Sequence, residues 1–87
     1  MKSRARIHFK AKGRLSFQKW LPELLRLLKK QGFGEVSISE SSLVLPFKGS
    51  PLSTAVTVAS LASFAYGGDA TFKRTGKNEF VVELHAL

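Results

Sequence analysis

Hydrophobic and basic positions alternate strictly along the first part of the chain. From Arg4 to Lys12, the odd-numbered residues are apolar and the even-numbered residues are basic. A period of two puts the two kinds of side chain on opposite faces of a β-strand. We therefore expect a half-buried strand over Arg4–Lys12, with Phe9 and its apolar neighbours facing the core.

After this strand the apolar period becomes that of a helix. Four leucines between Leu21 and Leu28 follow the i, i+3, i+4, i+7 spacing of one helical face. Pro22 suits the first turn of a helix, because it has no N–H to donate there. The pattern predicts a helix that begins near Leu21 and is capped at its C-terminus by Gly32.

Two short apolar runs follow, and the polar residues 40–42 separate them. Alternation predicts strands over Phe33–Ser39 and Leu43–Phe47, joined as a hairpin. In the first of these strands Val36 and Ile38 are expected to face inward. Pro46 makes the second strand an edge strand or ends it, because proline cannot donate to a sheet ladder.

The second half of the chain predicts a helix and a hairpin. Ser50 and Pro51 form an N-cap and first-turn pair, and two glycines after Tyr66 end the helix that they open. Strands are then expected over Ala70–Arg74 and Glu79–His85, around the turn at residues 75–78. Phe72 is expected to face the core.

The predicted order of elements is βαββαββ, in a single domain over residues 1–87. Two one-sided helices and a set of alternating strands indicate an α+β fold. The architecture that we expect is a ferredoxin-like antiparallel sheet with two helices on one face and an extra C-terminal strand. The first strand would be central, and its basic side would lie on the face that no helix covers.

Charge and composition narrow the possible partners. The chain has 14 Lys and Arg against 6 Asp and Glu, a net charge of +8, and a pI near 10.3. Such a balance favours an acidic partner, either nucleic acid or an acidic protein surface. The chain contains no cysteine, and its basic N-terminal segment has no apolar run typical of a secretory signal, so we expect a cytoplasmic protein. No stretch is long and apolar enough to predict a membrane span.

The basic side of the first strand is the strongest functional signal. Alternate residues of a strand are about 6.5 to 7 Å apart, close to the phosphate spacing of an extended nucleic-acid backbone. The basic side chains of the first strand thus form a row, here called the track, and cations of the C-terminal hairpin would extend it. The alternative is a solvated face neutralised by Glu35, Glu79 and Glu83. The predicted nucleic-acid-binding residues are Arg4, Arg6, His8, Lys10, Lys12, Arg14, Lys73, Arg74 and Lys77.

We interpret the protein as a small basic module that contacts the phosphate backbone of a nucleic acid, or a nucleoprotein complex. Phe9, the aromatic residue of the first strand, points inward by parity, so base stacking on this strand is not predicted. The sequence does not distinguish DNA from RNA. It contains no RNP sequence, helix-turn-helix, zinc finger or GxxG loop.

The second predicted helix suggests a different function. No charged residue occurs between Gly49 and Gly68, although the chain as a whole is strongly basic. A small, uncharged helix face is typical of a protein interface, because interface centres are depleted of charge. The alternative function is a protein–protein interaction module, such as an adaptor, inhibitor or small subunit, that docks onto an acidic partner through this helix or an edge strand. A homodimer is the other partner that we consider for this helix. The other interpretation is that this helix is buried in the core of the domain and has no partner. The predicted interface residues are Ser53, Val56, Thr57, Ser60, Ser63 and Phe64.

The sequence does not indicate an enzyme. Only His8 and His85 are of the residue type that titrates near neutral pH, and neither has an obvious partner in the sequence. The acidic residues are scattered and show no metal-ligand spacing. We therefore expect neither catalytic residues nor a metal or other cofactor.

Overall fold

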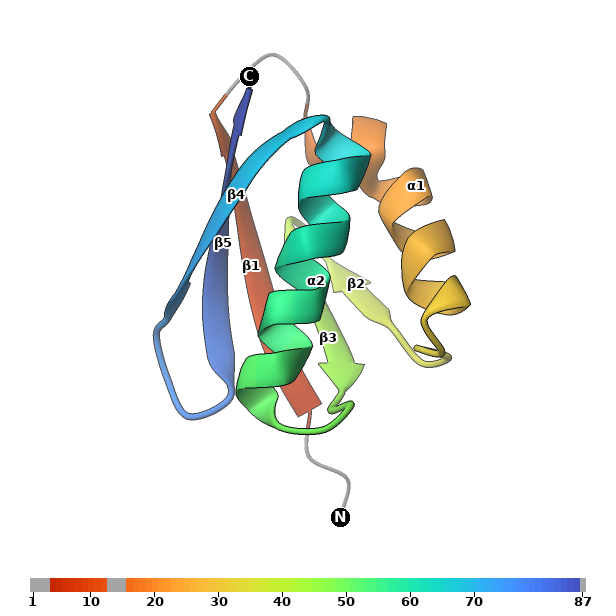
Figure 1. The fold of residues 1–87 in the computed structure, drawn as a ribbon, viewed down its shortest axis with the longest axis vertical. Helices are drawn as coiled ribbons and strands as arrows, with labels where there is room; N and C mark the ends of the chain where they lie inside the picture. Colours follow the sequence, from red (N-terminus) through yellow and green to blue (C-terminus); the bar gives the residue numbers. More distant parts are fainter. Residues whose placement is uncertain (1–3, 13–15, 87) are drawn as a thin grey trace.

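The computed structural model describes residues 4–12 and 16–86, which form two helices and a five-stranded mixed sheet (Figure 1). This is the α+β class that the sequence predicts. The elements in chain order are β1 (Arg4–Lys12), α1 (Phe17–Lys30), β2 (Ser37–Ser39), β3 (Ser42–Pro46), α2 (Pro51–Tyr66), β4 (Gly68–Arg74) and β5 (Glu79–Ala86).

The strand order is β2-β3-β1-β5-β4, so β1 is the middle strand, as expected. It pairs antiparallel with β3 and parallel with β5. The order differs from the ferredoxin-like one, in which the strand after the second helix lies beside the first strand. Here β5 takes that place and pushes β4 to the edge, because the β4–β5 hairpin folds back toward β1. The sheet is therefore mixed rather than antiparallel.

Both helices lie on one side of the sheet (Figure 1). The core lies between them and the odd-numbered side of β1. Aromatic residues from both helices and from β1 pack together at one end, where the Trp20 ring meets those of Phe9, Phe17 and Tyr66 edge-on, with ring centroids 5.1 to 5.8 Å apart. The fully buried side chains include Ile7, Leu24, Leu28, Leu43, Leu45, Val58, Phe80, Val82 and Leu84.

The first helix begins earlier than predicted. It starts at Phe17 and contains Pro22 in its interior, whereas the proline pattern had placed the start near Leu21. Phe17 and Trp20 are buried in the aromatic cluster, and this packing stabilises the additional turn. Gly32 follows the helix with φ of 93°, the left-handed conformation typical of a glycine just beyond a helix end.

Ile38 and Phe72 lie on the helix side of the sheet, as the sequence analysis expects, because they are in register with the buried Leu43 and Val82. Both are nevertheless incompletely buried, for the same reason. The strand β2 covers only Ser37–Ser39 of the predicted Phe33–Ser39, and Ile38 is 46% exposed. Phe72 of β4 is 37% exposed. Both lie in edge strands of the sheet, β2 at one edge and β4 at the other, where the two helices cover the sheet incompletely.

The second helix has the predicted bounds and the predicted cap. The Ser50 hydroxyl accepts a hydrogen bond from the Ser53 N–H, and the Ser53 hydroxyl accepts one from the Ser50 N–H, both at 3.0 Å. This reciprocal pair satisfies two backbone donors that a helix start otherwise leaves free. At the other end Gly67 adopts φ of 81° and closes the helix.

Candidate nucleic-acid interface

The even-numbered side of β1 lies on the face of the sheet opposite the helices, here called the open face. Arg4, Arg6 and Lys10 are exposed there, and His8 is half-buried. The backbone of Lys12 continues the strand in register with His85. Arg14, the next predicted contact, lies outside the described residues.

Acidic residues share the open face with these cations. The register sets Glu79 of β5 beside Arg6, and Glu83 beside Lys10. Glu35 accepts a hydrogen bond from the Arg4 guanidinium at 3.4 Å, although both side chains remain largely exposed. The three glutamates that the sequence analysis named as possible neutralising groups thus lie beside the track, and the local excess of positive charge is smaller than the sequence indicates.

The C-terminal hairpin adds cations at the end of the sheet where β1 starts. The Arg6 N–H donates to the Asn78 carbonyl at 2.8 Å, which holds the hairpin turn against the first strand. Lys73 lies on the open face of β4 in register with Val81 of β5, which in turn pairs with His8 of β1. Lys77 is exposed in the turn itself. Two of the three predicted hairpin cations therefore lie where they can extend the track.

Arg74 is placed differently from its neighbours. It pairs in register with Phe80, which faces the core, and its guanidinium lies 5.6 Å from the centre of the Phe80 ring. The same guanidinium donates to the carbonyls of Gly76 and Lys77. Arg74 thus braces the hairpin turn from the helix side and is not part of the open face.

His8 has two partners that the sequence did not indicate. Its Nδ1 lies 2.6 Å from the hydroxyl of Ser42 on β3, and its Nε2 lies 3.7 Å from a carboxylate oxygen of Glu79 on β5. Ser42 is only 7% exposed, so its hydroxyl has little access to a substrate. The arrangement orients the imidazole between the two neighbours of β1. The sequence pattern predicts a turn at Ser42, so only the strand register reveals the contact.

The aromatic residues of the strands are not on the open face. Phe9, Phe72 and Phe80 belong to the helix side, as the register with buried partners shows. Among the described strands, the open face therefore offers mainly charged and polar side chains to a ligand, with two imidazoles (His8 and His85) and no Phe, Tyr or Trp ring for a base to stack on. Chemically it suits contacts with phosphates rather than with bases.

The cations of α1 form a separate surface on the helix side of the molecule. Arg26 binds the Glu23 carboxylate through two hydrogen bonds, and its guanidinium lowers the pKa of Glu23 below the ordinary value of 4.5. Lys19 and Lys29 are exposed on the same helix. Lys19 and Lys29 are therefore exposed basic residues, like those of β1, that lie away from the open face.

The second helix is both core and surface. Thr54, Ala55 and Val58 are fully buried, so the inner side of the helix belongs to the core. Its outer side carries the predicted interface residues: Ser53, Val56, Ser60 and Phe64 are exposed, and Thr57 and Ser63 are half-buried. Leu52, which the sequence analysis did not include, is 49% exposed. Its four-residue spacing from Val56 is the signal that could have identified it.

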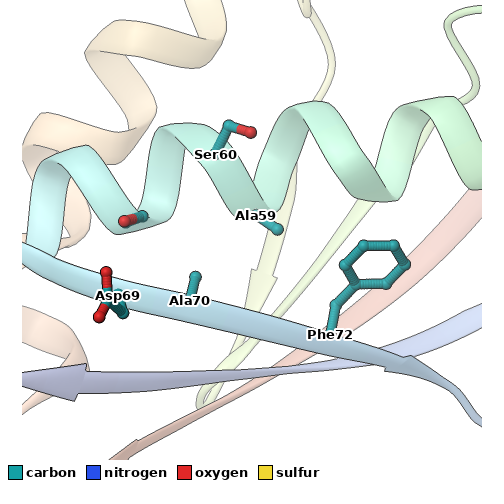
Figure 2. A pocket seen from close by; sticks show the side chains of 6 residues that line it. Ala59, Ser60, Asp69, Ala70 and Phe72 are labelled. Atoms are coloured by element: carbon teal, nitrogen blue, oxygen red, sulfur yellow. The ribbon is translucent and has the colours of Figure 1, made fainter.

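A groove runs between α2 and the edge strand β4 (Figure 2). Its volume is about 370 Å³. The ring of Phe72 rises from β4 along one side of the groove, and Ser60 extends from the helix above it (Figure 2). The lining residues are Ala59, Ser60, Ser63, Asp69, Ala70 and Phe72.

Comparisons of the chain with protein-family models, with curated proteins and with solved structures find no match. Among the described residues, no group of three or more His, Cys, Asp or Glu is arranged to hold a metal ion. Neither α1 nor α2 is long and apolar enough to cross a membrane.

Proposed function

We propose that this protein is a binding module that contacts the phosphate backbone of a nucleic acid through the open face of its sheet. The observation that supports this most is the position of β1. The middle strand of the sheet exposes Arg4, Arg6 and Lys10 on the face opposite the helices. A row of cations on a broad, uncovered surface suits an extended polyanion.

The hairpin cations extend this surface at one end. Lys77 lies in the hairpin turn that is hydrogen-bonded to Arg6, and Lys73 lies level with His8, with only β5 between their strands. The intervening glutamates lower the affinity for phosphates. The attraction between the cations and the phosphates weakens as salt is added. We expect non-specific binding, with a dissociation constant of about 10⁻⁴ to 10⁻⁶ M at physiological salt.

The proposed role is binding without catalysis, in the cytoplasm. Ser42, His8 and Glu79 lie in a row, but Ser42 is buried, and its hydroxyl contacts the imidazole and serves to orient it. The second candidate function is docking onto an acidic protein surface through the same cations. It is favoured by the lack of Phe, Tyr and Trp rings among the described strand residues of the open face, since a protein partner needs none.

Charge reversal on the open face tests the proposal against a matched control. Binding of short DNA and RNA strands is followed by fluorescence anisotropy over a salt series. The variant Arg6→Glu/Lys10→Glu is compared with Lys19→Glu/Lys29→Glu on α1, which lowers the net charge equally. We expect the open-face variant to lose at least about tenfold in affinity and about two units of the salt slope, because each cation contacts one phosphate.

The control variant should keep most of the affinity. Equal losses in both variants would mean that net charge, and not the open face, attracts the nucleic acid. If the native protein binds no nucleic acid even at low salt, the proposal is wrong and the acidic protein partner takes its place. Circular dichroism of both variants establishes that they are folded.

A further inference from the structure

The outer side of α2 carries an exposed row of uncharged side chains. Leu52, Val56, Ser60 and Phe64 are four residues apart and form one ridge of the helix. Phe64 is 75% exposed, the highest exposure among the large apolar side chains of the described residues. An aromatic ring left so far in water is typical of a residue that another molecule covers.

A complementary hollow lies directly beside this ridge. The α2–β4 groove is lined by Ser60, which is one turn from Phe64 on the same ridge, and by Phe72 of β4. At about 370 Å³ it has room for a phenyl ring. Figure 2 shows two small side chains between the elements, Ala59 from α2 and Ala70 from β4. A protruding ring and a hollow that fits it thus lie on one surface.

The charge of this surface indicates which partner it fits. No Lys or Arg occurs from Gly49 to Phe72, and Asp69 at the end of the groove is the only acid in that stretch. This surface therefore has no basic side chain that could pair with an acidic partner. A second copy of the chain, which is itself strongly basic, can approach most easily through a surface that carries no cations.

We propose that this surface binds a second copy of the chain in a two-fold dimer, with Phe64 of each copy in the α2–β4 groove of the other. In a two-fold interface, if residue i contacts residue j of the partner, j also contacts i. Two antiparallel α2 helices related by an axis between Ser60 and Phe64 satisfy this condition. The small Ser60 side chain then leaves space for the incoming ring.

The inference is independent of the proposed nucleic-acid binding, and the two respond to salt in opposite directions. Dimerisation through an uncharged surface of a basic chain should strengthen as salt screens the repulsion between the copies. Binding of phosphates should weaken. A salt series on the protein alone therefore reports on the dimer without any nucleic acid present.

Sedimentation velocity over a concentration series tests the dimer. The native protein should dimerise, and Phe64→Ser and Ser60→Arg should each weaken the dimer by roughly thirtyfold, as removal or blocking of a central anchor does. The matched control is Ile38→Ser, which removes a side chain that is 46% exposed on the opposite edge of the sheet. That change should leave the dimer intact.

Both test positions are exposed, so the variants should fold, and the fluorescence of Trp20, the single tryptophan, verifies this. A native protein that remains monomeric at millimolar concentration overturns the proposal. So does a dimer that Phe64→Ser and Ser60→Arg leave unchanged, one that Ile38→Ser disrupts equally, or one that weakens as salt is added.

Discussion

At the scale of single residues, the balance of charges on the open face decides how well the protein can bind a polyanion. Arg6 lies beside Glu79, and Lys10 beside Glu83. A carboxylate about 6 Å from a phosphate repels it by about 0.7 kcal/mol in water, which is about a threefold effect on affinity. The two glutamates should therefore oppose the cations that they neighbour.

Removing these two carboxylates should strengthen binding. The double variant Glu79→Gln/Glu83→Gln keeps the shape of both side chains, and we expect its affinity for nucleic acid to rise about tenfold at low salt. Anisotropy titrations of native and variant protein measure the change. Glu23→Gln is the control, because Glu23 is paired with Arg26 on α1 and the substitution should change affinity much less. An unchanged affinity of the double variant would place the ligand away from these strands.

At the scale of elements, the turn from α2 into β4 fixes the edge of the sheet. Gly67 ends the helix in a left-handed conformation, and Gly68 begins the strand at once. A Cβ at Gly68 would lie 2.1 Å from the backbone oxygen of His85, which cannot move aside as a side chain can. This close approach positions β4 against β5 and thereby forms one wall of the groove.

Substitution of Gly68 should accordingly destabilise the fold. We expect Gly68→Ala to lower the free energy of unfolding by about 2 kcal/mol, the cost of forcing extra volume into a packed site. Urea unfolding followed by Trp20 fluorescence gives the value. Gly34→Ala is the matched control, because nothing lies within 4 Å of its added Cβ, and it should change stability by less than about 1 kcal/mol. Similar effects of the two substitutions would contradict this account of the turn.

The elements themselves could largely be predicted from the sequence, because they depend on local signals. The alternation from Arg4 to Lys12 and the cap at Ser50 each specify a structure within a few residues. The start of α1 could not be predicted, because tertiary packing of Trp20 outweighs the local signal of Pro22. The same limit applies to the candidate site. The residues of the track follow from parity, but their acidic neighbours and the orientation of Arg74 depend on strand register, which no local pattern encodes.

At the scale of the whole molecule, two surfaces of different chemistry lie on different sides of the fold. The open face is polar and charged, whereas the outer side of α2 carries no charge. The insertion of β5 between β1 and β4 contributes to both, because β5 brings Glu79 and Glu83 to the open face and moves β4 to the edge beside α2. We therefore expect nucleic-acid binding and self-association to be separable by mutation.

The most direct test of the central proposal is a titration of the isotopically labelled protein with a short single-stranded oligonucleotide, followed by NMR shifts of the backbone amides. The account predicts that the perturbed amides belong to β1, β5 and the open-face side of β4, and that the shifts reverse when salt is added. Perturbations confined to α1 or to the outer side of α2, or no perturbation at low salt, would contradict it.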